Sequence, residues 1–199
     1  MKKLVLSIIP GLLLFSCKKG EKDPDFSLRS RKNRLAGEWK ITQAQKQHAD
    51  TVWTFTQNQM ILKIDTLPAD TFVIDFSWTF DAQGTYEKIF AVTYPPNYWY
   101  DGSKEVTQTT TEKGIWNFSG GAGTTKKKSQ LVLTEETVTT AADDVNLSVS
   151  AVKHIGNPFG KIYQITGLSN KKLYLDINYT REYAGGTTVL TESWEFDKQ

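Results

Sequence analysis

This 199-residue chain has 22 Asp and Glu but only two His and one Cys, and the spacing of these residues matches no catalytic motif. The histidines, His48 and His154, are predicted to lie in a turn and at a strand end, where a surface role is commoner than that of a general base. The neighbouring acids Glu135–Glu136 and Asp143–Asp144 offer fewer oxygens than Ca²⁺ requires. The sequence has no Gly-x-Ser-x-Gly elbow, phosphate-binding glycine loop or His-Glu-x-x-His motif. We therefore predict no enzymatic activity, cofactor or metal, although acids distant in sequence can still meet in a folded site.

The most unusual group of side chains lies in residues 94–102 (YPPNYWYDG). Pro95 and Pro96 exclude a regular β ladder, so Tyr98, Trp99 and Tyr100 are predicted to lie on a loop. Aromatic side chains on a loop can stack on a sugar ring or cover an apolar pocket. They can equally fold back as a plug over one end of the domain, and a plug can also serve as a lid.

The single cysteine, Cys17, ends an N-terminal segment with the features of a secretory signal peptide. Lys2 and Lys3 precede an apolar run of about 12 residues, whereas a membrane-spanning helix needs about 20. Residues 14–17 (LFSC) resemble the lipobox of bacterial lipoproteins, in which a diacylglyceryl group is added to the cysteine before cleavage ahead of it. The resemblance implies a signal peptide over residues 1–16 and a lipid anchor on Cys17; the alternative is an ordinary signal peptide. We expect the protein on the outer membrane, facing either the periplasm or the cell surface.

Residues 17–34 are polar and charged, with the composition of a flexible tether. Ser27 is predicted to cap a short helix over Leu28–Leu35 that ends at Gly37. The basic side chains of this helix are expected to be solvated, and contact with anionic lipid head groups is the alternative. These side chains are Arg29, Arg31, Lys32 and Arg34.

Composition allows one folded domain over residues 35–199, since 39% of the residues are hydrophobic and 12% aromatic. If Lys2 and Lys3 are removed with the predicted signal peptide, the 24 Lys and Arg fall to 22, the same number as the 22 Asp and Glu. A balanced surface lacks the basic face that nucleic acid requires, so we predict no nucleic-acid partner.

Beyond residue 40 apolar and polar side chains alternate, which predicts strands. The clearest case is a hairpin with turn residues at 81–84. Roughly eight to ten short strands with short connections predict an all-β, antiparallel sandwich or barrel. The segments with a strand-like pattern, from which these strands are expected, are Glu38–Gln43, Thr51–Thr56, Gln59–Ile64, Phe72–Phe80, Thr85–Tyr94, Gly114–Phe118, Gln130–Thr134, Asn146–His154, Lys161–Ile165, Lys172–Arg181 and Thr188–Phe196.

Four sequence motifs resemble those of the lipocalin-like lipoproteins of Gram-negative bacteria, within the lipocalin family. Gly37 and Trp39 match the lipocalin Gly-x-Trp signature, which follows a short helical turn. The other three are the hairpin at 78–86 (WTFDAQGTY), the Gly-x-Trp strand at 114–116 and the strand approach at 165–175. The resemblance covers residues 35 to about 197 and implies an up-and-down antiparallel barrel of about eight strands with a short N-terminal helical turn. Lipocalins also pack a late arginine over the first tryptophan, a role that we do not assign to Arg181.

A barrel of this size is either filled by its own side chains or holds one small ligand, and the sequence leaves both open. We expect a lipid-anchored barrel that binds a small apolar or amphiphilic ligand. The alternative is a structural or partner-binding lipoprotein with a filled barrel, which contacts protein or glycan through its loops. The candidate ligand-binding residues are Phe72, Phe76, Trp78, Trp116 and Trp194 in the interior, with Tyr98, Trp99 and Tyr100 on the loop.

Overall fold

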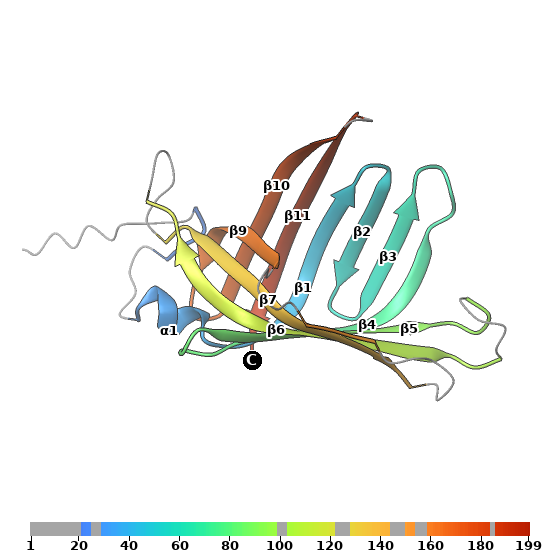
Figure 1. Ribbon diagram of the computed structural model, residues 1–199, viewed down its shortest axis with the longest axis horizontal. Coiled ribbons are helices and arrows are strands. Elements are labelled where there is room, and N and C mark those ends of the chain that lie inside the picture. The colour runs from blue at the N-terminus through green and yellow to red at the C-terminus, as the bar shows by residue number, and fades with distance from the viewer. Residues whose placement is uncertain are drawn as a thin grey trace, which may run out of the picture.

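Alternating side chains build the described part of the chain into antiparallel strands that close into a barrel (Figure 1). The structure is a computed structural model and describes residues 21–24, 29–98, 103–121, 128–143, 150–153, 159–183 and 186–199. The elements are α1 (Arg31–Leu35), β1 (Gly37–His48), β2 (Thr51–Thr56), β3 (Gln59–Ile64), β4 (Asp70–Phe80), β5 (Thr85–Tyr94), β6 (Val106–Ser119), β7 (Gln130–Ala142), β8 (Ser150–Lys153), β9 (Phe159–Leu168), β10 (Lys172–Tyr183) and β11 (Gly186–Lys198).

The barrel ring contains ten strands, so the prediction of about eight is wrong. The strand order is β6-β5-β4-β3-β2-β1-β11-β10-β9-β7, and pairing of β6 with β7 closes it. Within the described residues, β8 pairs with β7 alone. The extra width comes from the β2–β3 hairpin, which lies between β1 and β4 over part of their length.

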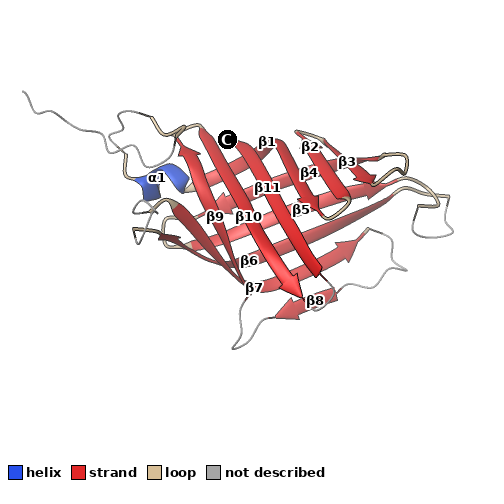
Figure 2. Cartoon of the chain, turned by 90° about the horizontal axis from the view of Figure 1, so that it is seen from above, coloured by secondary structure: helices blue, strands red, loops and turns tan. Residues whose placement is uncertain are grey.

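The two ends of the barrel differ in width. Beside α1, β1 pairs directly with β4 over Gly37–Lys40, so that end of the ring omits β2 and β3. We call it the closed end, and the opposite end, with the β1–β2 and β3–β4 turns, the wide end. β9 pairs with β10 only over Leu173–Asp176, next to the closed end. In Figure 1, β10, β11, β1, β2 and β3 rise away from the layer formed by β4–β7, and the two layers meet near α1. Figure 2 shows α1 at one end of the strands and β8 at an edge.

The predicted β4–β5 hairpin is confirmed, and Asp81 organises its turn. Its Oδ1 accepts hydrogen bonds from the backbone N–H of Gln83 and Gly84 at 2.8 and 2.7 Å. The hydroxyl of Thr85 donates to Oδ2 at 2.5 Å. The hydrogen bonds from Thr85 lower the pKa of Asp81 to about 2. Gly84 adopts a φ of +111°, a conformation that side chains with a Cβ rarely take.

Trp39 lies at the closed end of the barrel and is fully buried. Its indole Nε1 donates to the carbonyl of Leu35, at the end of α1, at 2.7 Å. The ammonium group of Lys198 lies 5.0 Å from the ring centroid. The cation over this tryptophan is therefore a lysine, not the late arginine named in the sequence analysis. Gly37 turns the chain from α1 into β1 with a φ of +127°, and a Cβ there would lie 2.5 Å from Lys198 Cε.

The segment before β1 is docked on the closed end. Ser30 caps α1, so the helix begins later than a cap at Ser27 would place it. Arg31 and Arg34 are buried, which contradicts the expectation of a fully solvated basic helix. Arg31 donates to Asp23 Oδ2 at 2.6 Å, and Asp23 Oδ1 accepts from the backbone N–H of Leu168 at 2.7 Å. The buried carboxylate of Asp23 therefore joins residues 21–24 both to α1, through the ion pair, and to β9 of the barrel wall, through the hydrogen bond.

We predict that Trp39→Ala lowers the free energy of unfolding by about 3–5 kcal/mol, because it leaves a cavity in the fully packed end of the barrel. Denaturant unfolding followed by circular dichroism measures the change. Trp53→Ala is the control, since Trp53 is half-buried near the wide end and its ring lies 4.9 Å from Lys46 Nζ. An equal loss in both variants would contradict the role of Trp39 at the closed end.

Candidate functional site

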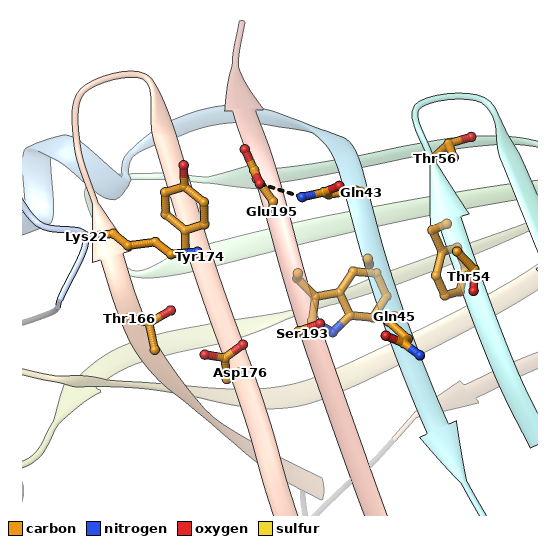
Figure 3. Close-up of a pocket in the computed structure, with 13 residues that line it drawn as sticks. Lys22, Gln43, Gln45, Thr54, Thr56, Thr166, Tyr174, Asp176, Ser193 and Glu195 are labelled. Carbon is orange, nitrogen blue, oxygen red and sulfur yellow. Dashed lines mark hydrogen bonds between the residues drawn. The ribbon is translucent and has the colours of Figure 1, made fainter.

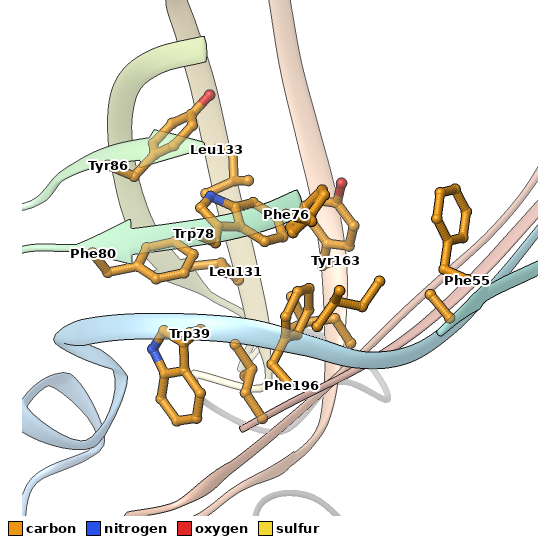
Figure 4. Packing of buried hydrophobic residues seen from close by; sticks show 14 of the residues in the cluster. Trp39, Phe55, Phe76, Trp78, Phe80, Tyr86, Leu131, Leu133, Tyr163 and Phe196 are labelled. Carbon is orange, nitrogen blue, oxygen red and sulfur yellow. The ribbon is translucent and has the colours of Figure 1, made fainter. Parts of the chain in front are cut away.

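Four aromatic rings from opposite walls meet inside the barrel. Phe55 of β2 and Phe76 of β4 each lie against Trp194 of β11, with centroid distances of 5.3 and 5.6 Å. Phe90 of β5 lies 5.7 Å from Phe76 and 6.3 Å from Phe55. Towards the closed end the packing becomes complete (Figure 4). Side chains buried there include Trp39, Trp78, Phe80, Leu131, Leu133 and Phe196.

A buried ion pair lies on the interior wall formed by β5 and β6. The ammonium group of Lys88 contacts the carboxylate of Glu112, and their side chains are only 17% and 8% exposed. The hydroxyl of Tyr86 donates to the other carboxylate oxygen of Glu112 at 2.6 Å. Register places Lys88 opposite Trp78, so both side chains lie on the inward face.

The pKa values in this cluster follow from burial and from the ion pair. Burial lowers the pKa of Lys88, and the charge of Glu112 offsets part of that effect. Burial would raise the pKa of Glu112, but the attraction and hydrogen bonds of Lys88 and Tyr86 outweigh it, so the pKa is lowered. Burial and the bond to Glu112 raise the pKa of Tyr86. At neutral pH Glu112 is therefore a carboxylate and Tyr86 a hydrogen-bond donor.

Further polar groups lie inside the barrel on β9 and β11. Glu192 is 5% exposed and accepts a hydrogen bond from Trp194 Nε1 at 2.9 Å. The buried Tyr163 packs edge-on against Trp78 at 5.6 Å, and burial, followed by the charge of Glu192, raises its pKa. The indole nitrogen of Trp78 is buried and has no acceptor among the described residues. The interior therefore has a polar wall on β5, β6, β9 and β11 and an aromatic wall on β2 and β4.

Inward-facing apolar side chains become exposed towards the wide end. Along β10, Leu173 and Leu175 are 0% exposed, Ile177 is 7% exposed and Tyr179 is 51% exposed. Along β3, exposure rises from 7% at Met60 to 42% at Ile64. Apolar surface on the inside of the wide end thus remains open to solvent.

The residues predicted from sequence to bind a ligand divide into separate groups. Phe76 contacts Trp78 at 6.3 Å and Trp194 at 5.6 Å, so these three lie together in the interior. Trp116 instead lies at the closed end, where its ring is 6.1 Å from Phe80 and its Nε1 donates to the carbonyl of Asp81.

Phe72 lies nearer the wide end than Phe76 and meets the only predicted loop aromatic that the structure describes. The ring of Tyr98 is 5.0 Å from Phe72, and its hydroxyl donates to Asp70 Oδ2 at 3.2 Å. Tyr98 therefore folds back onto β4. Trp99, Tyr100 and the predicted lipidation site Cys17 lie outside the described residues.

A polar groove of about 380 Å³ lies on the outer surface of the barrel (Figure 3). Its lining comes from β1, β2, β9, β10 and β11, together with Lys22 from the docked N-terminal segment. Glu195 accepts hydrogen bonds from Gln43 Nε2 and Lys172 Nζ, each at 2.9 Å. The bond from Lys172 is the main cause of the lowered pKa of Glu195.

No family model, curated protein or solved structure matches this chain.

Two kinds of site are missing from the part of the chain that the structure describes. No three His, Cys, Asp or Glu side chains there lie close enough together to hold a metal ion. None of the described helices has the length and apolar character needed to cross a membrane.

The polar wall of the interior is what the sequence analysis missed. In the predicted strand Thr85–Tyr94, the two-residue period puts Tyr86, Phe90, Val92 and Tyr94 on one face, and Lys88 belongs to the same face. A charged residue within an otherwise apolar face is a signal that can be read from the sequence. Glu112 carries no such signal, because its neighbours in β6 are mostly threonine.

We predict that Lys88→Met inverts the pH dependence of stability. In the parent protein the lowered pKa of Glu112 gives a contribution that is present above pH 4.5 and lost as the pH falls through that lowered pKa. Without Lys88, burial raises the pKa of Glu112, so the contribution is complete below pH 4.5 and lost as the pH rises. Thermal unfolding measured from acid to neutral pH tests the inversion, and the expected loss at neutral pH is about 3–5 kcal/mol.

Lys113→Met is the matched control, because Lys113 forms a 2.8 Å ion pair with Glu87 across the same two strands but on the exposed outer face. An exposed pair contributes about 0–1 kcal/mol, so its loss leaves the pH profile unchanged in form. A Lys88→Met profile parallel to that of the parent would contradict the buried ion pair.

Proposed function

We propose that this protein is a lipid-anchored lipoprotein of the outer membrane whose lipocalin-like barrel binds a small apolar or amphiphilic molecule through its wide end. The observation that carries the proposal is the rise in exposure of inward-facing apolar side chains, from 0% at Leu175 to 51% at Tyr179. Apolar surface that stays exposed to water is a common feature of ligand-binding sites, whereas a barrel filled by its own side chains would bury it. The surface is suited to an apolar ligand that enters from the wide end.

The two walls of the interior support an amphiphilic ligand in particular. Apolar parts of the ligand would contact the inward face of β3 at Ile64 and Leu62, and then the aromatic rings of the interior, which include Phe90. Its polar group would be directed to the wall that carries Lys88, Glu112 and Glu192, where buried charges and hydroxyl groups supply both donors and acceptors.

The proposed anchor also sets the orientation of the barrel. The backbone N–H of Lys22 donates to the carbonyl of Thr166 at 2.8 Å, and Asp23 is bound to Leu168 and Arg31. The chain extends by at most about 3.6 Å per residue, so Cys17 lies within about 18 Å of Lys22. A lipid on Cys17 would therefore hold the closed end towards the membrane and direct the wide end away from it.

We predict that the environment-sensitive dye 1-anilinonaphthalene-8-sulfonate binds the native protein at the wide end. Ile64→Asp places a charge on the inward face and is expected to weaken dye affinity by about tenfold or more, since burial of an isoleucine is worth about 1.5–3 kcal/mol. Fluorescence titration at a temperature where circular dichroism shows the folded state measures the affinity.

Val73→Asp is the matched control for this titration, because Val73 is a comparable apolar residue on the outer face and is 60% exposed. Unchanged binding in Val73→Asp and weakened binding in Ile64→Asp support the interior site. Equal effects, or no dye binding by the parent, would argue against it and favour the alternative of a filled barrel.

We further predict that Cys17→Ala moves the protein from the membrane fraction to the soluble fraction, because a stable anchor requires the acyl chains on this cysteine. Ser16→Ala, which keeps a small residue before the cysteine, is the control and is expected to stay with the membrane. Fractionation and immunoblotting give the readout. Continued membrane attachment of Cys17→Ala would contradict the lipid anchor.

A further inference from the structure

The outer groove is built from two rows of polar side chains that cross the same four strands. In the first row, register aligns Thr56, Gln43, Glu195 and Tyr174. Strands lie about 4.8 Å apart, so a row across four strands measures about 14 Å, and rows two residues apart are separated by about 7 Å. The second row aligns Thr54, Gln45, Ser193 and Asp176 (Figure 3).

The two rows differ in how their polar groups are used. In the first row, Gln43 and Lys172 both donate to Glu195, which fixes its carboxylate. In the second row, no side chain forms a hydrogen bond or ion pair with another residue among those that the structure describes; these side chains are Thr54, Gln45, Ser193 and Asp176. The groove therefore contains an ordered row beside a row of free donors and acceptors.

Asp176 stands out from other carboxylates on the outer face. Asp75, Glu87 and Asp197 each pair with a lysine at 2.7 to 2.9 Å. Asp176 has no such partner in the described structure, although it is partly buried. Its carboxylate is left as an acceptor within a concave surface.

Tyr174 provides a flat aromatic surface at one end of the first row. It lies opposite Gly167 of β9, where an added Cβ would come within 2.7 Å of the Tyr174 ring. The glycine therefore allows the ring to lie close over the neighbouring strand. Lys22 Nζ is 4.1 Å from the ring centroid and adds a donor at this edge of the groove.

We propose that this groove binds a neutral carbohydrate, of about the length of a disaccharide. Each sugar hydroxyl both donates and accepts, as do the amide of Gln45 and the hydroxyls of Thr54 and Ser193. Asp176 would accept from a sugar hydroxyl, and Tyr174 would contact the apolar edge of a ring. A single unpaired carboxylate does not suffice for a metal cation, and the mixture of neutral donors and acceptors does not select a charged partner.

The carbohydrate groove and the proposed amphiphile site lie on opposite faces of one wall. Ala44, Phe55 and Trp194 also line the groove, but their side chains belong to the inward-facing set. A substitution of an outward side chain therefore tests the groove without altering the interior surface.

Saturation-transfer difference NMR on the full-length protein tests the proposal, with cellobiose, lactose, chitobiose and methyl β-glucoside as probes at about 10 mM, a concentration that detects dissociation constants in the millimolar range. We expect transfer to the ring protons of at least one disaccharide. Asp176→Asn and Gln45→Ala, at positions whose side chains form no hydrogen bond or ion pair among the described residues, are expected to weaken that binding by about tenfold and to leave dye binding unchanged.

Asp75→Asn is the matched control, since Asp75 is an outward carboxylate of β4 outside the groove. Retained sugar binding in Asp75→Asn and weakened binding in Asp176→Asn support the proposal. It is overturned if none of the probes receives saturation, or if Asp176→Asn binds as tightly as the parent protein. Because the interior is tested by Ile64→Asp with the dye and the groove by Asp176→Asn with sugars, either proposal can fail without the other.

Discussion

The interior of a β-barrel has to be filled by side chains or left for a ligand, and its diameter rises with the number of strands. This constraint acts differently at the two ends of the protein, because the β2–β3 hairpin joins the wall only beyond the direct pairing of β1 with β4. At the closed end, buried side chains that include Trp39, Trp78, Phe80 and Phe196 fill the ring. At the wide end the inserted hairpin separates β1 from β4, and inward side chains such as Ile64 and Tyr179 become exposed. The position of one hairpin thus accounts for both the packed closed end and the exposed apolar side chains at the wide end.

The alternation of apolar and polar residues correctly predicted strands whose inward faces are apolar. Where part of an inward face is polar, the predicted strand was too short. β4 and β5 agree with the predicted hairpin, whereas Gly114–Phe118 was expected where β6 runs from Val106 to Ser119. The added part of β6 presents Thr110 and Glu112 to the interior, and Thr110 is hydrogen-bonded to Thr140 of β7. A rule that equates the interior with apolar residues cannot detect such a wall. The polar inward face of β6 is therefore the reason why the sequence analysis missed both the added length of this strand and the buried ion pair.

The number of strands in the ring and the docking of the N-terminal segment depend on contacts between distant residues. The sequence indicates that β2 and β3 are strands, but not that β1 also pairs with β4 beyond them. Likewise, nothing near Asp23 in the sequence indicates that its carboxylate accepts from the backbone N–H of Leu168. Local patterns predicted Gly37 as the turn into β1, because that role depends on its own φ and on one neighbouring side chain.

The buried pair of Lys88 and Glu112 needs a reason other than stability. Removing two charges from water costs several kcal/mol per ion, and well-packed apolar residues often give equal or greater stability. Lys88 Nζ lies 5.8 Å from the centroid of the Trp78 ring, so the pair borders the aromatic wall, and the proposed amphiphile would direct its polar group towards it. On β10 and β11 the two-residue period puts Asp176 and Ser193 on the other side of the same wall. The two proposed sites would therefore use alternate residues of shared strands, and substitutions at either site would leave the backbone pairing that defines the barrel unchanged.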